Sequence, residues 1–147
     1  MKIQTILVAI DFSDHAEQAF DTACELAKRW DAALHVVHAF EIIAPLVTPY
    51  QVSIPDTYLT ESRDVALRQL SERVDKARAQ GITTESHLTE SPAAQAIART
   101  AEEIGADLIV MGTRGMTGLK HFVLGSVAER TLRLAPCSVL TVKSPEA

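Results

Sequence analysis

The sequence predicts an α/β fold, namely a single doubly wound domain with a five-stranded parallel sheet and helices on both faces. Five short apolar segments rich in β-branched residues alternate with four segments of helical periodicity. The chain has 147 residues, which suits one domain with its own core, and no internal repeat is evident. Sustained alternation of this kind favours parallel strands joined by right-handed crossovers.

The first half of the chain is expected to hold two strands and one helix. Residues 3–10 (IQTILVAI) are almost continuously apolar, as in a strand covered on both faces. Apolar or small residues then recur at spacings of three and four from Ala16 to Trp30, which marks one face of a helix. Residues 33–40 (ALHVVHAF) predict the second strand. Residues 41–56 contain three prolines and predict a long irregular connection, either a lid or partner surface or a crossover that only wraps the domain edge.

The second half is expected to add three strands and three helices. Strands are predicted at 82–88, 107–111 and 137–143, and helices at about 57–80, 92–104 and 126–135. Gly81 and Gly105 follow two of these helices, where glycine commonly forms the C-terminal cap. Ser91 suits the N-cap of the helix predicted at about 92–104, and Pro92 suits its first position.

Composition and charge argue against several classes of protein. The formal net charge is −5 and no local basic cluster appears, so no nucleic-acid partner is expected. No apolar run approaches the roughly 20 residues of a membrane helix, and the N-terminus indicates a first strand rather than a signal peptide. Cys24 and Cys137 form neither a metal-binding spacing nor a disulfide framework, so buried free thiols and a cytoplasmic location are expected.

The most unusual residues follow the predicted strands, where ligands bind in doubly wound sheets. Asp11 follows the first strand, and Gly112 opens the glycine-rich stretch GTRGMTGLKHFVLGS. Glycines before a helix suit a phosphate, because the backbone can approach closely and the helix N-terminus presents free amides. Arg114 could add positive charge and Ser126 a hydroxyl donor. The spacing matches neither the dinucleotide-binding nor the Walker pattern, so the residues alone also allow a loop that only needs positive φ.

The proposed ligand contact at Asp11 and a metal site at two histidines both have simpler interpretations. Asp11 could cap the following helix, as could Ser13 or Asp14. His35 and His38, separated by two residues in the second strand, are expected to project to one face, a geometry that a metal could use. No cysteine or carboxylate partner is evident in the sequence, so packing or strand-edge histidines are expected instead.

One spacing is more specific. Gly112, Gly115, nine intervening residues and then Gly125-Ser126 form the pattern G-x2-G-x9-G-[S/T]. Together with Asp11-x-Ser13, the second-strand segment LHVVHAF and the closing segment PCSVLTV, it resembles the ATP-binding branch of the universal stress protein family across essentially all of residues 1–147. The resemblance implies a Rossmann-like fold of the adenine nucleotide alpha-hydrolase-like type. Ala9 and Asp14-His15 depart from the residues common in relatives, which affects the expected shape of the first loop.

The resemblance also implies roles for individual residues. Asp11 is expected near the ribose and the metal-bound phosphates, as a contact for Mg²⁺ in Mg-ATP, and Ala39 in the adenine pocket. The phosphates are expected at Gly112, Gly115, Gly125 and Ser126, bordered by Met111, Arg114, Val127 and Ala128. Relatives often dimerise by antiparallel pairing of their last strands, which implies a homodimer through residues 139–142, with Val139 and Val142 at the ends of the pairing segment.

The leading hypothesis is therefore an ATP-binding, nucleotide-dependent regulatory homodimer that acts in the stress response with an unknown protein partner. A slow ATP hydrolase is one alternative, although no water-activating base is evident beside the motif. A nucleotide-free dimeric adaptor is another, and the retained glycine pattern counts against it.

Overall fold

Strands and helices alternate along the chain as predicted. The computed structural model describes residues 1–41, 55–114 and 124–145. Within these residues the elements are β1 (Thr5–Ala9), α1 (Asp14–Trp30), β2 (Ala33–Ala39), α2 (Asp56–Arg78), β3 (Thr84–Thr89), α3 (Ala93–Ile104), β4 (Leu108–Gly112), α4 (Ser126–Leu134) and β5 (Ser138–Val142). None of the helices in this part of the chain has both the length and the apolar character needed to cross a membrane. Most of the predicted connection at 41–56 lies outside the described residues.

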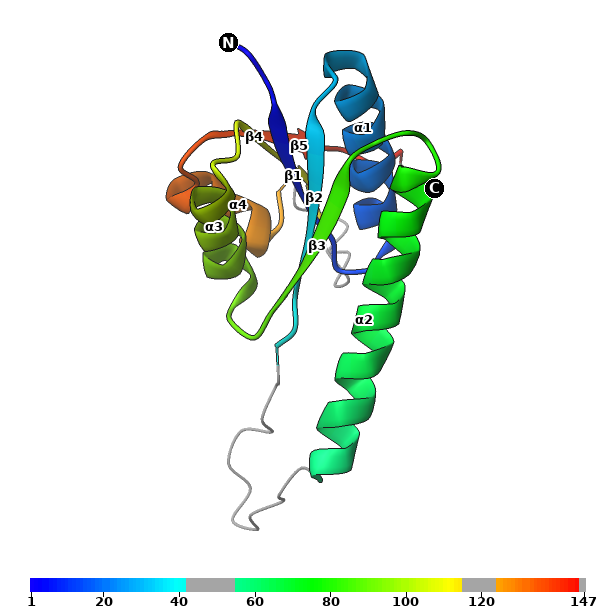
Figure 1. The fold of residues 1–147 in the computed structure, drawn as a ribbon. Helices are drawn as coiled ribbons and strands as arrows, with labels where there is room; N and C mark the ends of the chain where they lie inside the picture. Colours follow the sequence, from blue (N-terminus) through cyan, green and yellow to red (C-terminus); the bar gives the residue numbers. More distant parts are fainter. Residues whose placement is uncertain (42–54, 115–123, 146–147) are drawn as a thin grey trace.

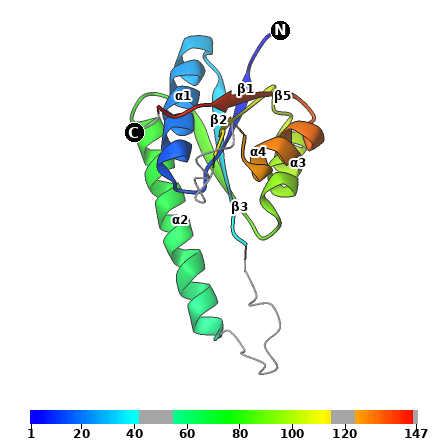
Figure 2. The same ribbon diagram turned by 180° about the vertical axis from the view of Figure 1, so that it is seen from behind.

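The strands form one parallel sheet in the order β3-β2-β1-β4-β5. Helices α1 and α2 cover one face, and α3 and α4 cover the other (Figure 1 and, from behind, Figure 2). The chain moves outward from β1 to β3 and then crosses by α3 to β4 on the other side of β1, so the strand order reverses between β1 and β4. The predicted doubly wound α/β fold is confirmed, and this reversal is where such sheets bind ligands.

Alternate residues of the central strands supply the two halves of the core. Ile6 and Val8 of β1 pack with Phe20 of α1 on one face, and all three side chains are fully buried. Leu7 packs with Ile97 of α3 on the other face. Both faces of β1 are thus covered, which explains why its sequence is apolar at successive positions rather than at every second one.

Both cysteines are free thiols, as predicted, but only one is fully buried. Cys24 lies in the core between α1 and the sheet, whereas Cys137 is half-buried beside β5. Burial, with a smaller contribution from Asp21, raises the pKa of the Cys24 thiol to about 11. Cys24 is therefore a protonated, unreactive thiol at neutral pH.

The two predicted glycine caps differ in their outcome. Gly105 follows α3 with φ 65° and forms the expected left-handed C-terminal cap. Helix α2, however, ends at Arg78 with Ala79 as its C-cap residue, and the prediction that Gly81 caps it is wrong. Gly81 has φ 81° and lies in the turn that leads toward β3, where glycine adopts this conformation with little strain.

The start of α3 is also one residue later than predicted. Pro92 is the N-cap residue and Ala93 the first helical residue, so the assignment of Ser91 as the N-cap is wrong. The Ala93 amide donates a hydrogen bond of 2.9 Å to Oε1 of Glu41, which follows β2. A carboxylate distant in sequence thus takes the place of the local serine cap.

Candidate functional site

A cavity of about 270 Å³ lies where the strand order reverses, beyond the carboxyl ends of β1, β2 and β4. This volume is close to the lower end of the range for small-ligand pockets. Asp11 follows β1, Ala39 ends β2, and Met111 and Gly112 end β4, and all four border the cavity. Four residues predicted from the sequence therefore surround one space, although they come from three different strands.

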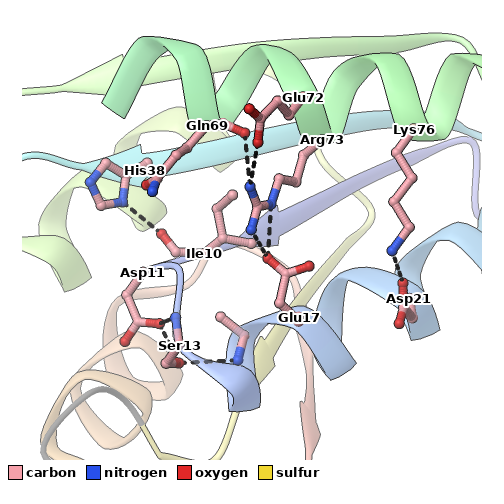
Figure 3. Close-up of polar contacts among 11 residues, drawn as sticks. Ile10, Asp11, Ser13, Glu17, Asp21, His38, Gln69, Glu72, Arg73 and Lys76 are labelled. Carbon is pink, nitrogen blue, oxygen red and sulfur yellow. Dashed lines mark hydrogen bonds and ion pairs between the residues drawn. The ribbon is translucent and has the colours of Figure 1, made fainter. Parts of the chain in front are cut away.

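The turn between β1 and α1 holds the Asp11 side chain at the cavity wall. Oδ1 of Asp11 accepts a hydrogen bond of 3.0 Å from the Ser13 amide and a short one from the Ser13 hydroxyl (Figure 3). The Ser13 hydroxyl oxygen in turn accepts a hydrogen bond of 3.2 Å from the Ala16 amide. Ser13 is thus the N-cap of α1, and the Asp11 carboxylate fixes the turn and borders the cavity instead of capping the helix.

Gly112 is a glycine because the backbone of α1 passes close to it. A Cβ atom at this position would lie 3.2 Å from the His15 carbonyl oxygen and 3.2 Å from that of Arg114. Both contacts are tighter than ordinary van der Waals contacts. The close approach of β4 and α1 therefore depends on the absence of a side chain here. Arg114 also borders the cavity and brings a positive charge to this wall.

Helix α4 points its N-terminus into the cavity. The Gly125 amide donates to the Thr113 carbonyl at 2.6 Å, and the first helical hydrogen bond runs from the Glu129 amide to the Gly125 carbonyl. The amides of residues 126–128 consequently have no partner within the helix. Gly125 and residues 126–128, which are Ser126, Val127 and Ala128, all border the cavity. Free amides and the positive end of the helix dipole favour an anion at this position.

His38, which was expected to be a packing or strand-edge histidine, also borders the cavity. Its Nδ1 lies 2.8 Å from the Ile10 carbonyl oxygen (Figure 3). A carbonyl oxygen only accepts, so Nδ1 donates, and Nε2 of the neutral ring is an acceptor. The His38 ring packs on that of Phe12 with centroids 4.5 Å apart. Its place one residue before Ala39 was the available signal for a role at this strand end.

Arg73 of α2 supports the same turn from outside the cavity. Its Nε donates to Oε1 of Glu17 on α1 at 2.8 Å (Figure 3). The Arg73 guanidinium also lies 5.3 Å from the centroid of the Phe12 ring. Phe12 has φ 64°, an uncommon conformation for a non-glycine residue. The contacts from Arg73 and His38 hold this residue in place, so α2 braces the segment that carries Asp11.

One predicted residue, Gly115, lies outside the described residues. The other nine residues expected at or beside the ligand, Ala128 included, all border the cavity described above. Their positions are consistent with the predicted site, and ligand binding by these residues stays a prediction.

The expectation that His35 and His38 project to one face of the sheet is wrong. The two residues are three positions apart on β2, and side chains alternate across a strand, so they project to opposite faces. His38 packs on Phe12, on the side of α1 and α2, whereas Nδ1 of His35 lies 2.9 Å from Nε2 of His87 on β3. Burial lowers the pKa of His35, and the neighbouring His87 lowers it further.

Comparison with known proteins identifies the family. The model of the universal stress protein family matches residues 2–143. The chain belongs to this family. A universal stress protein of Bacillus subtilis is 34% identical over 144 residues, which cover 94% of this chain and 97% of the relative. The crystal structure of a universal stress protein family member from Burkholderia pseudomallei is 32% identical, covers 96% of each chain and has a TM-score of 0.76.

Two similar structures contain adenine nucleotides. One is a universal stress protein in complex with cAMP, which is 27% identical, covers 99% of this chain and 100% of its own, and has a TM-score of 0.70. The other is a universal stress protein from Archaeoglobus fulgidus in complex with dAMP, which is 27% identical, covers 96% of this chain and 98% of its own, and has a TM-score of 0.65.

Proposed function

We propose that this universal stress protein binds ATP in the cavity between β1 and β4 and acts as a nucleotide-dependent regulatory homodimer in the stress response. The observation that carries the proposal is the N-terminus of α4, whose free amides open on the same cavity as Asp11 and Gly112. The similar structures with cAMP and dAMP support an adenine nucleotide as the ligand class. Residues 1–147 would form one universal stress protein domain, and we propose a cytoplasmic location.

The cavity offers suitable groups for each part of a nucleotide. The amides of residues 126–128, the Ser126 hydroxyl and the Arg114 guanidinium suit the phosphates. The Asp11 carboxylate is an oxygen ligand of the kind that Mg²⁺ prefers, and it borders the same cavity. Ala39, at the end of β2, leaves room for a planar base because its side chain is small. These residues would bind and orient the nucleotide, with Mg²⁺ neutralising phosphate charge.

Regulation would follow from the difference in affinity between two states of the protein. A ligand shifts a conformational equilibrium only as far as it binds one state better than the other. Nucleotide bound at the α4 N-terminus would favour one arrangement of β4, α4 and β5, because α4 connects the last two strands. A change in this region would reach a dimer partner at β5.

Strand β5 has the features of a dimerisation edge. It pairs with β4 and ends the sheet order, and Leu140 on it has 38% of its surface exposed. Leu132 and Leu134 of α4 are also exposed large apolar side chains. An edge strand with exposed apolar residues is protected when it pairs with another strand, so a second copy of the chain is the proposed partner.

The proposal is tested by calorimetric titration of nucleotide-stripped protein with Mg-ATP, using Ser126→Glu and Ser126→Gln. Ser126 is exposed at the first turn of α4, where a carboxylate stabilises the helix, so Ser126→Glu should fold normally. A carboxylate about 5 Å from a phosphate would cost roughly 3 kcal/mol at an effective dielectric constant of about 20, or roughly a hundredfold in affinity. The glutamine of Ser126→Gln has nearly the same size as glutamate but no charge, so this variant should lose much less affinity for Mg-ATP.

Saturable binding by the wild type that is lost in Ser126→Glu and largely retained in Ser126→Gln would support the phosphate site. Equal affinity of all three proteins would contradict the role of α4. Absence of binding by folded wild-type protein would refute ATP binding and favour the nucleotide-free adaptor.

A further inference from the structure

A second group of polar side chains lies on β2 and β3, apart from the nucleotide cavity. His35 comes from β2, and Glu85 and His87 come from the edge strand β3. Their candidate ligand atoms all lie within 4.8 Å of one another, and none of the three residues lines the cavity. We propose that His35, Glu85 and His87 bind a divalent transition metal ion, with Zn²⁺ as the best match to these ligands.

The parallel pairing of the two strands places the three side chains on one face. His35 is the register partner of Glu85, and Val37 is that of His87. Residues two apart on a strand project to the same side, so Glu85 and His87 are neighbours on the face that Val37 shares with α3. All three ligand side chains would belong to residues of regular β-strands, and sites built on such elements hold their geometry better than sites on loops.

The distances are close to those of a tetrahedral metal site. Two imidazole nitrogens bound to Zn²⁺ at about 2.0–2.1 Å are roughly 3.3 Å apart in a tetrahedral site. Nδ1 of His35 and Nε2 of His87 are 2.9 Å apart, so they would need to separate by only a few tenths of an ångström. Oε2 of Glu85 lies 4.0 Å from Nδ1 of His35 and would need to approach by a somewhat larger amount.

The exposure of the side chains permits this adjustment and the entry of an ion. The Glu85 side chain is 69% exposed and free to rotate, whereas the His35 side chain is only 15% exposed and is held by its surroundings. A metal would thus meet one fixed ligand from the sheet and two from its solvent-facing edge. Two histidines and one glutamate also leave the fourth tetrahedral position for water or another ligand.

The ligand types select the kind of ion. Imidazole suits Zn²⁺, Cu²⁺, Ni²⁺ and iron, whereas Mg²⁺ and Ca²⁺ prefer sites made only of oxygen. The 2.9 Å contact has a simpler explanation, in which one neutral histidine donates a hydrogen bond to the other. The two explanations differ in a measurable way, because only the metal site predicts saturable binding that depends on Glu85 as well as on His87.

The test is calorimetric titration of the full-length, chelator-treated and nucleotide-stripped protein with Zn²⁺ at pH 7.5. The variants are His87→Ala, Glu85→Gln and, as a matched control, Glu103→Gln, which removes an exposed carboxylate on α3. Glu85 is chosen because its side chain is more exposed than that of His35, and His87 because it lies on the edge strand β3. Thermal unfolding with and without Zn²⁺ gives a second measurement, since an ion bound only to the folded state raises Tm.

We expect one Zn²⁺ per wild-type chain, a loss of at least about tenfold in affinity in His87→Ala and in Glu85→Gln, and wild-type affinity in Glu103→Gln. Zn²⁺ should raise the Tm of the wild type and of Glu103→Gln but not that of His87→Ala. Absence of saturable binding by the wild type would overturn the proposal. Equal binding by the wild type and His87→Ala would also overturn it, because the ion would then be held elsewhere on the chain.

Discussion

Replacing Gly112 with alanine tests the tight contact between β4 and α1 at the candidate site. The added Cβ would lie 3.2 Å from the carbonyl oxygens of His15 and Arg114, and both neighbours are backbone atoms that cannot rotate away. Overpacking of this kind costs about 1–3 kcal/mol. Gly112 does not have a positive φ, so without these contacts alanine would instead stabilise the protein by about 0.4–1 kcal/mol through the unfolded chain.

The two explanations thus predict opposite signs for the change in stability. Urea unfolding at constant pH measures the free energy, and each kcal/mol corresponds to a decrease in Tm of roughly 2–4 °C for a chain of this size. We expect Gly112→Ala to be less stable than the wild type and to bind Mg-ATP more weakly, because β4 and α1 must separate at the cavity. A variant with equal or greater stability would refute the packing explanation for Gly112.

Three further predictions concern the helices, a core thiol and the sheet edge. Arg73→Ala should lower the free energy of unfolding by about 1–3 kcal/mol because it removes half-buried charged hydrogen bonds to Glu17. If the losses in unfolding free energy of Arg73→Ala and Glu17→Ala simply add in the double variant, the two residues are not coupled and the explanation is wrong. Stability should fall as the pH rises from about 9 to about 11, because unfolded Cys24 ionises near its ordinary pKa of 9.0 while the folded thiol keeps its proton up to a pKa of about 11. Urea unfolding at pH 8 and pH 10.5 should show a steeper loss for the wild type than for Cys24→Ala, and equal losses would contradict the raised pKa. Leu140→Lys should convert the proposed homodimer into monomers in sedimentation velocity, and an unchanged dimer would place the interface elsewhere.

Local patterns in the sequence were enough to predict most of the fold. The continuous apolar run before Asp11 and the spacing of three and four from Ala16 to Trp30 each depend on a few consecutive residues, and both elements were predicted correctly. Glycine-rich spacing and strand-end position likewise indicated the region of the site. Helix boundaries were less predictable, since Ala93 is capped by Glu41, which is distant in sequence.

Only the tertiary structure decided which side chains meet. Strand order and register place β4 beside β1, so that Gly112 borders the same cavity as Asp11, and they place His87 rather than His38 beside His35. These neighbours are set by packing between segments that are far apart in the chain, and the periodicity of a single strand carries no information about its partner. The sequence by itself therefore determined the elements and the region of the candidate site, whereas the grouping of His35, Glu85 and His87 depends on the pairing of β2 with β3.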